Sequence, residues 1–112
     1  MKGHCISVWL LVVATSVLLG CEDQAFDGAT NRGQTIYQTN CQGCHDDPSV
    51  NLRVKPPDLH GLYSRKSLPS GAPITDEQVR KTIQQGRGIM PPFGRVFSQG
   101  DLDDLIAYLH SK

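Results

Sequence analysis

The chain has 112 residues, with 11 Lys and Arg balanced by 11 Asp and Glu, 38% hydrophobic residues and four Cys. This length fits one small domain and excludes a two-domain enzyme. The zero net charge argues against a nucleic-acid-binding protein that relies on phosphate neutralisation, and the hydrophobic fraction is too high for a disordered tail. The composition therefore indicates one compact globular domain that binds no nucleic acid.

Residues 1–20 have the layout of an export signal. One lysine precedes an apolar stretch of fourteen residues (6–19), which spans about 21 Å as a helix and is short for crossing a membrane. The stretch ends in Leu-Leu-Gly-Cys at 18–21, which resembles the bacterial lipoprotein box, in which the cysteine is lipidated and becomes the first mature residue. We therefore expect a lipid on Cys21, with cleavage without lipidation as the alternative.

A short tether and a first helix are expected to follow. Residues 21–27 form the tether, and the six residues after the cysteine reach at most about 21 Å when extended. The first helix is predicted over Gly28–Asn40, with Ile36 and Tyr37 facing inward. Because a glycine in a helix costs about 1 kcal/mol relative to alanine, Gly33 predicts the close approach of another helix.

Residues 41–45 read Cys-Gln-Gly-Cys-His, the C-x-x-C-H pattern of c-type haem attachment. Two thiols three residues apart on one turn can each add to a vinyl group of the porphyrin, and the adjacent His45 is directed at the iron from the same side. A domain this small also usually needs a disulfide, a metal or a cofactor to stabilise one native state. The pattern therefore predicts one covalent haem c bound through Cys41, Cys44 and His45.

Three other interpretations of these five residues are weaker. A thioredoxin-like redox dithiol needs a strand–helix context, which this helical segment lacks. A zinc site needs a fourth ligand at a familiar spacing, and neither His60 nor His110 supplies one. A disulfide between Cys41 and Cys44 would close a loop of only a few residues and would therefore stabilise the folded state very little.

The middle of the chain combines a long loop with a second helix. Residues 46–70 are polar and rich in proline, which predicts a loop with one short helix. The capping-box pattern Thr-Asp-Glu-Gln at 75–78 predicts the start of a helix that ends at Gly86. Val79 and Ile83, four residues apart, then face inward.

The last helix carries the clearest signals. Ser98 is placed to cap it, and four apolar residues fall on one face at helical spacing. They are Leu102, Leu105, Ile106 and Leu109. The aspartates at 101, 103 and 104 match the positive end of the helix dipole, and we assign them a structural role rather than a catalytic one.

Residues 28–112 resemble a small class I cytochrome c. Beyond C-x-x-C-H, the segment Gly-Arg-Gly-Ile-Met-Pro-Pro-Phe at 86–93 resembles the family's G-x-G-x-M-P-x-F, and Pro-Asp-Leu-His-Gly at 57–61 resembles its P-x-L-x-G. The resemblance implies an all-α class I cytochrome c fold, with three to five helices wrapped around one covalently attached haem.

The same resemblance assigns roles to individual residues. It implies that Met90 is the second axial ligand of the iron. It also implies that the carbonyl of Pro57 accepts a hydrogen bond from the axial His45, which fixes the tautomer of the ring. Arg65 matches a basic residue that meets a haem propionate in some members, whereas His60 falls at a variable position and is interpreted as a surface residue.

His/Met ligation leaves no open site on the iron, which favours electron transfer over peroxidase, oxygen-carrier or sensor chemistry. Leu59, Leu62, Ile83 and Phe93 are expected to form a shell that limits water and favours a positive midpoint potential. We therefore predict a one-electron carrier and no enzymatic activity. Two alternatives stay open: a subunit of a larger oxidoreductase complex, and a haem sensor or enzyme whose methionine is displaced by a small ligand.

The distribution of charge suggests how the protein meets its partners. Between Arg53 and Arg95 there are eight basic and three acidic residues, a net charge of +5. This segment contains the Met90 loop, so we predict an exposed haem edge ringed by basic side chains that docks on an acidic patch of a redox partner. A lipid on Cys21 would hold the carrier at a membrane on the extracytoplasmic, periplasmic side of a bacterial cell envelope, close to its donors and acceptors.

Overall fold

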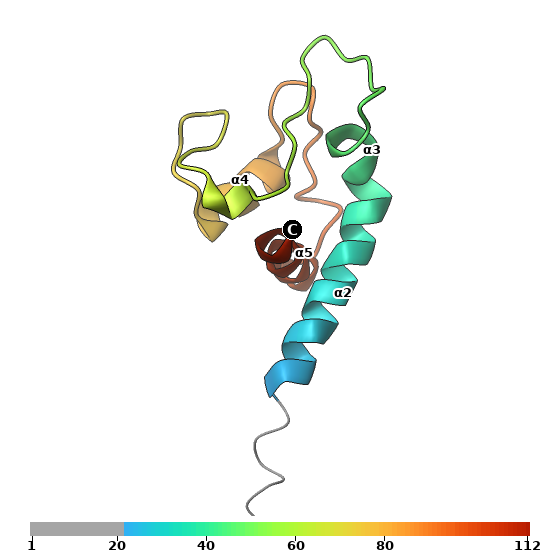
Figure 1. The fold of residues 1–112 in the computed structure, drawn as a ribbon, viewed down its shortest axis with the longest axis vertical. Helices are drawn as coiled ribbons and strands as arrows, with labels where there is room; N and C mark the ends of the chain where they lie inside the picture. The colour runs from blue at the N-terminus through green and yellow to red at the C-terminus, as the bar shows by residue number, and fades with distance from the viewer. Residues whose placement is uncertain (1–21) are drawn as a thin grey trace, which may run out of the picture.

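The computed structural model describes residues 22–112, and in them the chain is helical without a β-strand. Its elements are α2 (Glu22–Asn40), α3 (Gln42–His45), the short 3-10 helix η1 (Leu62–Ser64), α4 (Asp76–Gln85) and α5 (Gln99–Ser111) (Figure 1). The expected all-α fold, and the loop with one short helix before residue 70, are confirmed. The predicted export signal and Cys21 lie outside the described residues. Among the helices of residues 22–112, none combines the length and the hydrophobicity that a membrane span requires.

Helix α2 begins six residues earlier than predicted, at Glu22 instead of Gly28. Residues 22–27 contain neither proline nor glycine, and a single glycine at 28 costs only about 1 kcal/mol, so nothing ends the helix there. These residues therefore form helical turns rather than an extended tether. At 1.5 Å per residue they span about 9 Å instead of 21 Å.

Helices α2 and α5 pack against each other and form the centre of the fold (Figure 1). At Gly33 the two backbones touch, because a Cβ there would lie 1.9 Å from the carbonyl oxygen of Asp104. The guanidinium of Arg32 donates two hydrogen bonds, of 2.6 and 3.0 Å, to the carboxylate of that same aspartate. The rings of Tyr37 and Tyr108 meet with centroids 5.3 Å apart. The close helix approach predicted from Gly33 is confirmed.

The hydrophobic core lies along this helix contact and continues to α4 and η1. The four predicted apolar residues of α5 are all buried, as are Val79 and Ile83 of α4. Tyr37, Leu102 and Leu105 are the largest side chains that are fully enclosed. Leu62 and Leu68, from the long loop, complete the buried cluster.

The helix ends follow the predicted caps. The hydroxyl of Thr75 accepts a hydrogen bond from the backbone N–H of Gln78 at the start of α4, and Gly86 follows its last residue. At the start of α5, Ser98 and Asp101 form a reciprocal capping box. Asp103 pairs with Arg80 of α4, and Asp104 with Arg32 of α2. All three aspartates therefore make contacts that stabilise the ends and the packing of the helices.

Candidate haem-binding site

A cavity of about 480 Å³ opens between the α2–α3 junction, the loop after α3 and the segment that follows α4. Its wall includes Cys41, Cys44 and His45 from the first of these segments, and Met90 from the last. The structure thus brings to one cavity the four residues that were predicted from separate sequence motifs. A cavity of this size and enclosure is typical of a cofactor site.

The wall of the cavity is apolar with a few cations. The predicted shell is present, because Leu59, Leu62, Ile83 and Phe93 all line it. The charged side chains on the wall are Lys55, Arg65 and Arg87, and no aspartate or glutamate is among the lining residues. An apolar slot with a cationic fringe fits a flat hydrophobic group that carries carboxylates, and a haem with its two propionates has this chemistry.

The attachment segment is a tight turn at the end of α2. The backbone N–H of Cys41 donates to the carbonyl of Tyr37 at 2.8 Å, and the N–H groups of Cys44 and His45 donate to the carbonyl of Cys41 at 3.1 and 3.0 Å. Cys41 and the single turn of α3 that follows it therefore present both thiols and the imidazole to the cavity. Burial raises the pKa of the Cys41 thiol to about 11, with smaller contributions from Asp46 and Cys44.

The structure also bears on the weaker interpretations of this motif. Both Cys41 and Cys44 are free thiols. Within residues 22–112, the potential metal-binding cluster is made of Asp46, Asp58 and His60 and contains neither cysteine. The strand that a thioredoxin-like dithiol requires is missing from this part of the chain.

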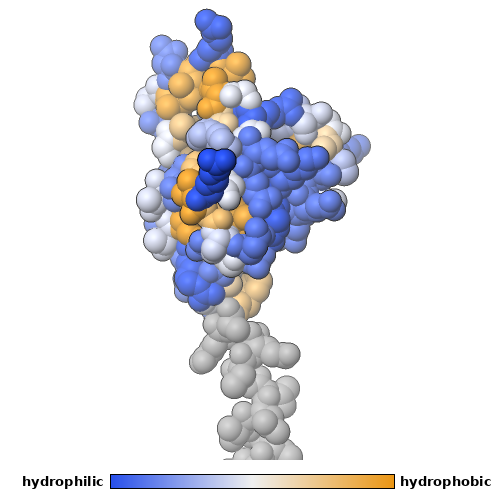
Figure 2. Space-filling view, turned by 180° about the vertical axis from the view of Figure 1, so that it is seen from behind, coloured by the Kyte–Doolittle hydropathy of each residue, from blue (hydrophilic) through white to orange (hydrophobic). Residues whose placement is uncertain are grey.

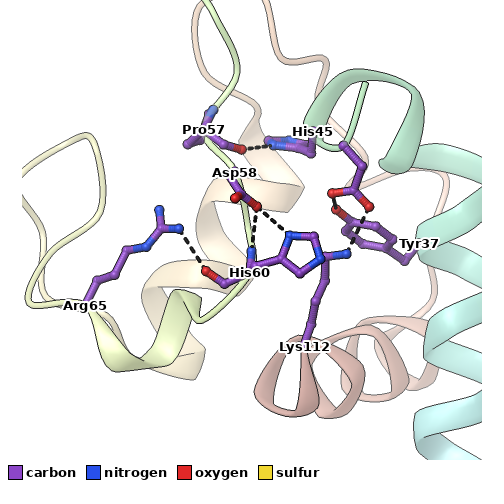
Figure 3. A network of polar contacts seen from close by, with 8 residues as sticks. Tyr37, His45, Pro57, Asp58, His60, Arg65 and Lys112 are labelled. Atoms are coloured by element: carbon purple, nitrogen blue, oxygen red, sulfur yellow. Dashed lines mark hydrogen bonds and ion pairs between the residues drawn. The ribbon is translucent and has the colours of Figure 1, made fainter. Parts of the chain in front are cut away.

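The ring of His45 is oriented by the backbone of the long loop. Its Nδ1–H donates a hydrogen bond of 2.7 Å to the carbonyl oxygen of Pro57 (Figure 3). The predicted partner is therefore confirmed, and Nε2 is left as the nitrogen with a free lone pair. Such a bond fixes the tautomer of a metal-binding histidine and raises its basicity.

The loop that carries Met90 is held by its backbone. Gly86 has a φ of 68°, and a Cβ at this position would lie 2.5 Å from the carbonyl oxygen of Met90. Arg87 and Met90 exchange two backbone hydrogen bonds of 3.0 and 2.9 Å, and the N–H of Phe93 donates to the carbonyl of Ile83 in α4 at 2.9 Å. The half-buried Met90 thus lies on a stiff loop at the cavity wall.

Two polar groups beside this site were missed by sequence reasoning. Asp46 accepts hydrogen bonds from Tyr37 and from Lys112. Asp58 accepts two hydrogen bonds from His60, which is exposed as predicted (Figure 3). An aspartate directly after the motif is a weak signal, because nothing in the local spacing identifies a partner 66 residues away.

The helical fold and the thiol, imidazole and thioether groups around one cavity define the class of small c-type cytochromes. Residues 28–109 match the family described as cytochrome C oxidase, cbb3-type, subunit III, and the chain belongs to this family. It is 28% identical over 108 residues to cytochrome c6 of Picosynechococcus, an alignment that covers 93% of this chain and 89% of the relative. It is 24% identical over 104 residues to cytochrome c6 of Gloeothece citriformis, with 90% and 89% covered. Its identity to cytochrome c of Kluyveromyces lactis is 24% over 98 residues, with 73% and 89% covered.

The family and the cavity agree on the cofactor and on the kind of protein. The cofactor is one covalently bound haem c, and the protein is an electron carrier rather than an enzyme. The expected class I cytochrome c fold is confirmed with it.

Proposed function

We propose that this protein is a monohaem electron carrier of the cell envelope. In this proposal the haem is attached through Cys41 and Cys44, and its iron is bound by His45 and Met90. The observation that carries the proposal is the convergence of these four side chains on one apolar cavity from segments more than forty residues apart. When bound, the haem supplies an iron that accepts and releases a single electron.

The surrounding residues have roles that suit this chemistry. The hydrogen bond from His45 to Pro57 keeps the imidazole in one orientation, so that little reorganisation accompanies a change of charge on the metal. The soft thioether of Met90 favours the reduced metal. Leu62 and Ile83, both buried, exclude water from the wall and disfavour additional positive charge.

The visible spectrum of Met90→Ala tests the ligation. Protein is produced in a host that attaches c-type haem, and oxidised wild type is compared with Met90→Ala and with Ile89→Ala. Ile89 lies on the same loop with 52% of its surface exposed, so its truncation controls for general disturbance of the loop. We expect the sulfur-to-iron charge-transfer band in wild type and Ile89→Ala and its loss in Met90→Ala. Retention of the band in Met90→Ala would refute this ligand.

The cavity mouth supplies a surface for a redox partner. Leu52, Val54 and Ile89 line the cavity and are nevertheless 40%, 62% and 52% exposed. Hydrophobic surface gathers at the end of the molecule that carries the loop after α3 (Figures 1 and 2). Of the eight basic residues in the predicted ring, three line the cavity wall: Lys55, Arg65 and Arg87. An apolar patch edged by cations matches a partner with an acidic rim around its own redox site.

The ionic-strength dependence of electron transfer tests this docking surface. We expect the rate with the physiological partner to fall as salt is added, and to fall less steeply for Lys55→Gln, because one attractive charge is gone. Lys81→Gln is the matched control, since Lys81 is equally charged, exposed on α4 and absent from the cavity wall. A wild-type rate that does not respond to salt would refute electrostatic docking.

Membrane attachment through a lipid on Cys21 completes the proposal. The helical start of α2 supports a short connection between the anchor and the domain, which would confine the carrier to membrane-bound donors and acceptors and raise their effective concentration. The protein is expected in the membrane fraction of the periplasmic side, and Cys21→Ala is expected to abolish that fractionation. A wild-type protein that fractionates as soluble after export would refute the anchor.

A second candidate function is a fixed subunit of a respiratory oxidase. The observation that favours it is the family description, which names an oxidase subunit. Purification after mild detergent extraction distinguishes a fixed subunit from a free carrier. A subunit elutes with its complex at constant stoichiometry, whereas a carrier elutes alone. A haem sensor with a displaceable Met90 is the remaining alternative, and ready binding of carbon monoxide to the reduced protein at neutral pH would favour it.

A further inference from the structure

Two aspartates flank the hydrogen bond that orients the axial histidine. Asp46 follows His45 in the sequence, and Asp58 follows Pro57. Oxygens of the two carboxylates and a ring nitrogen of His60 all lie within 4.8 Å of one another. Two carboxylates at this separation repel each other, so each needs a positive or donating partner if the two segments are to stay together.

The partners of the two carboxylates differ in exposure. Asp58 is paired with His60 at the surface, where both side chains are more than half exposed and solvent screens their charges. Asp46 is enclosed: its side chain is 19% exposed, and that of its partner Lys112 only 7%. Solvent therefore screens this second pair far less.

The ammonium group of Lys112 is held by two contacts, and the two groups that make them are hydrogen-bonded to each other. Its Nζ lies 2.9 Å from Oδ2 of Asp46 and 4.4 Å from the centroid of the Tyr37 ring, where a cation is favoured. The Tyr37 hydroxyl donates to the other carboxylate oxygen, Oδ1, at 2.7 Å (Figure 3). Tyr37 is itself 1% exposed and lines the cavity. The end of α5 is thus joined through one carboxylate to the turn that carries His45.

We propose that Lys112 is a positioning and charge-compensating residue of the haem centre. Its ammonium group neutralises the carboxylate of Asp46. This pairing keeps the His45 turn against the Pro57 loop, and it prevents the enclosed carboxylate from stabilising the oxidised iron. The inference rests on the proposed ligation by His45. Its physical basis is that an unpaired negative charge beside a metal favours the more positive oxidation state and lowers the reduction potential.

Potentiometric titration of the haem-loaded protein tests this role. Lys112→Met keeps the apolar stem over Tyr37 and removes the ammonium, and we expect its midpoint potential to shift below that of wild type. Lys81→Met removes the same charge from an exposed site on α4 and is expected to leave the potential unchanged. The double variant Asp46→Asn with Lys112→Met removes both charges and is expected to recover the wild-type potential.

The outcomes separate a functional role from a structural one. Equal potentials for Lys112→Met, Lys81→Met and wild type, with a loss of thermal stability alone, would overturn the inference. If Lys112→Met does not accumulate with haem, the midpoint potential of the single variant Asp46→Asn provides the test. Its unpaired Lys112 cation should raise the potential above that of wild type, and an unchanged potential would overturn the proposal. Loss of haem absorption in wild type would overturn the proposed function and this inference with it, whereas normal spectra with equal potentials overturn the inference alone.

Discussion

Substitution of Gly33 by alanine is the most direct test of how the two long helices meet. The new Cβ would lie 1.9 Å from the carbonyl oxygen of Asp104 and 2.8 Å from the Cβ of Tyr108, whereas ordinary contact begins at 3.4 Å. The nearest obstacle is backbone, so no change of side-chain rotamer relieves the clash. Helices α2 and α5 must therefore separate by roughly 1.5 Å, against the close packing of the core.

The size of the effect follows from two opposing contributions. Overpacking of this kind costs about 1–3 kcal/mol, and a backbone clash belongs at the upper end. Alanine recovers about 1 kcal/mol, because it favours the helix more than glycine does. We expect a net loss of about 2 kcal/mol in the free energy of unfolding. For a domain of this size this loss corresponds to a melting temperature lower by about 8–16 °C.

Chemical unfolding of the haem-loaded protein, followed by far-UV circular dichroism, measures this loss. Gly28→Ala on the same helix is the matched control, because its Cβ would meet only the flexible end of Arg32, at 3.3 Å. The control gains the helix propensity without the clash, and we expect it to equal or slightly exceed wild type in stability. If Gly33→Ala were as stable as Gly28→Ala, the backbone contact between α2 and α5 would not limit how closely the two helices pack, which would refute this prediction.

Three further predictions concern the caps, the core and the acid limit of stability. Ser98→Ala removes the acceptor for the Asp101 N–H and should cost about 1 kcal/mol in urea unfolding, whereas Ser98→Thr should retain most of the cap. Leu105→Ala, at 1% exposure, should cost about 2–5 kcal/mol in thermal unfolding, and Val96→Ala, at 63% exposure, close to nothing. Burial alone would raise the pKa of Asp46, but hydrogen bonds from Lys112 and Tyr37 hold it below its ordinary 3.8. The stability that the Asp46 carboxylate contributes is therefore present above pH 3.8 and is lost as the pH falls through its lower folded-state pKa. Asp46→Asn should therefore lose less stability than wild type on acidification. An unchanged decrease of the free energy of unfolding at low pH would contradict this role of Asp46.

Local sequence signals predicted most of the helical framework. The apolar face of α5, the Ser98 cap and the start of α4 at Thr75 depend on residues within two turns of one another, and all three are present in the structure. The haem motif is equally local, since residues 41–45 carry both thiols and the imidazole on one turn. Such features can be predicted from a short segment without information about the rest of the chain.

The features that sequence reasoning missed depend on distant contacts or on the absence of a signal. The pair of Asp46 and Lys112 joins residues 66 positions apart, and no spacing rule connects them. The early start of α2 was missed because Gly28 was taken as a boundary, although a glycine alone does not end a helix. The excess of basic residues between Arg53 and Arg95 is visible in the sequence. Which of them line the cavity depends on the fold, because Lys55 lies on the cavity wall whereas Arg80 pairs with Asp103.

The two proposed iron ligands are held by different parts of the scaffold. The turn of His45 is bound to α2 through the carbonyl of Tyr37 and to α5 through Lys112, whereas the loop of Met90 is bound to α4, whose last carbonyls accept the N–H groups of residues 93 and 94. The thioethers proposed at the His45 turn would hold the haem there covalently, whereas Met90 would be held against it by the proposed iron–sulfur bond, by backbone hydrogen bonds and by packing. Because these restraints are weaker than a covalent bond, thermal or chemical stress should release the methionine before the histidine. The charge-transfer band is therefore expected to disappear at lower denaturant than the helical signal, and simultaneous loss of both would show that α4 unfolds only together with the α2–α5 pair.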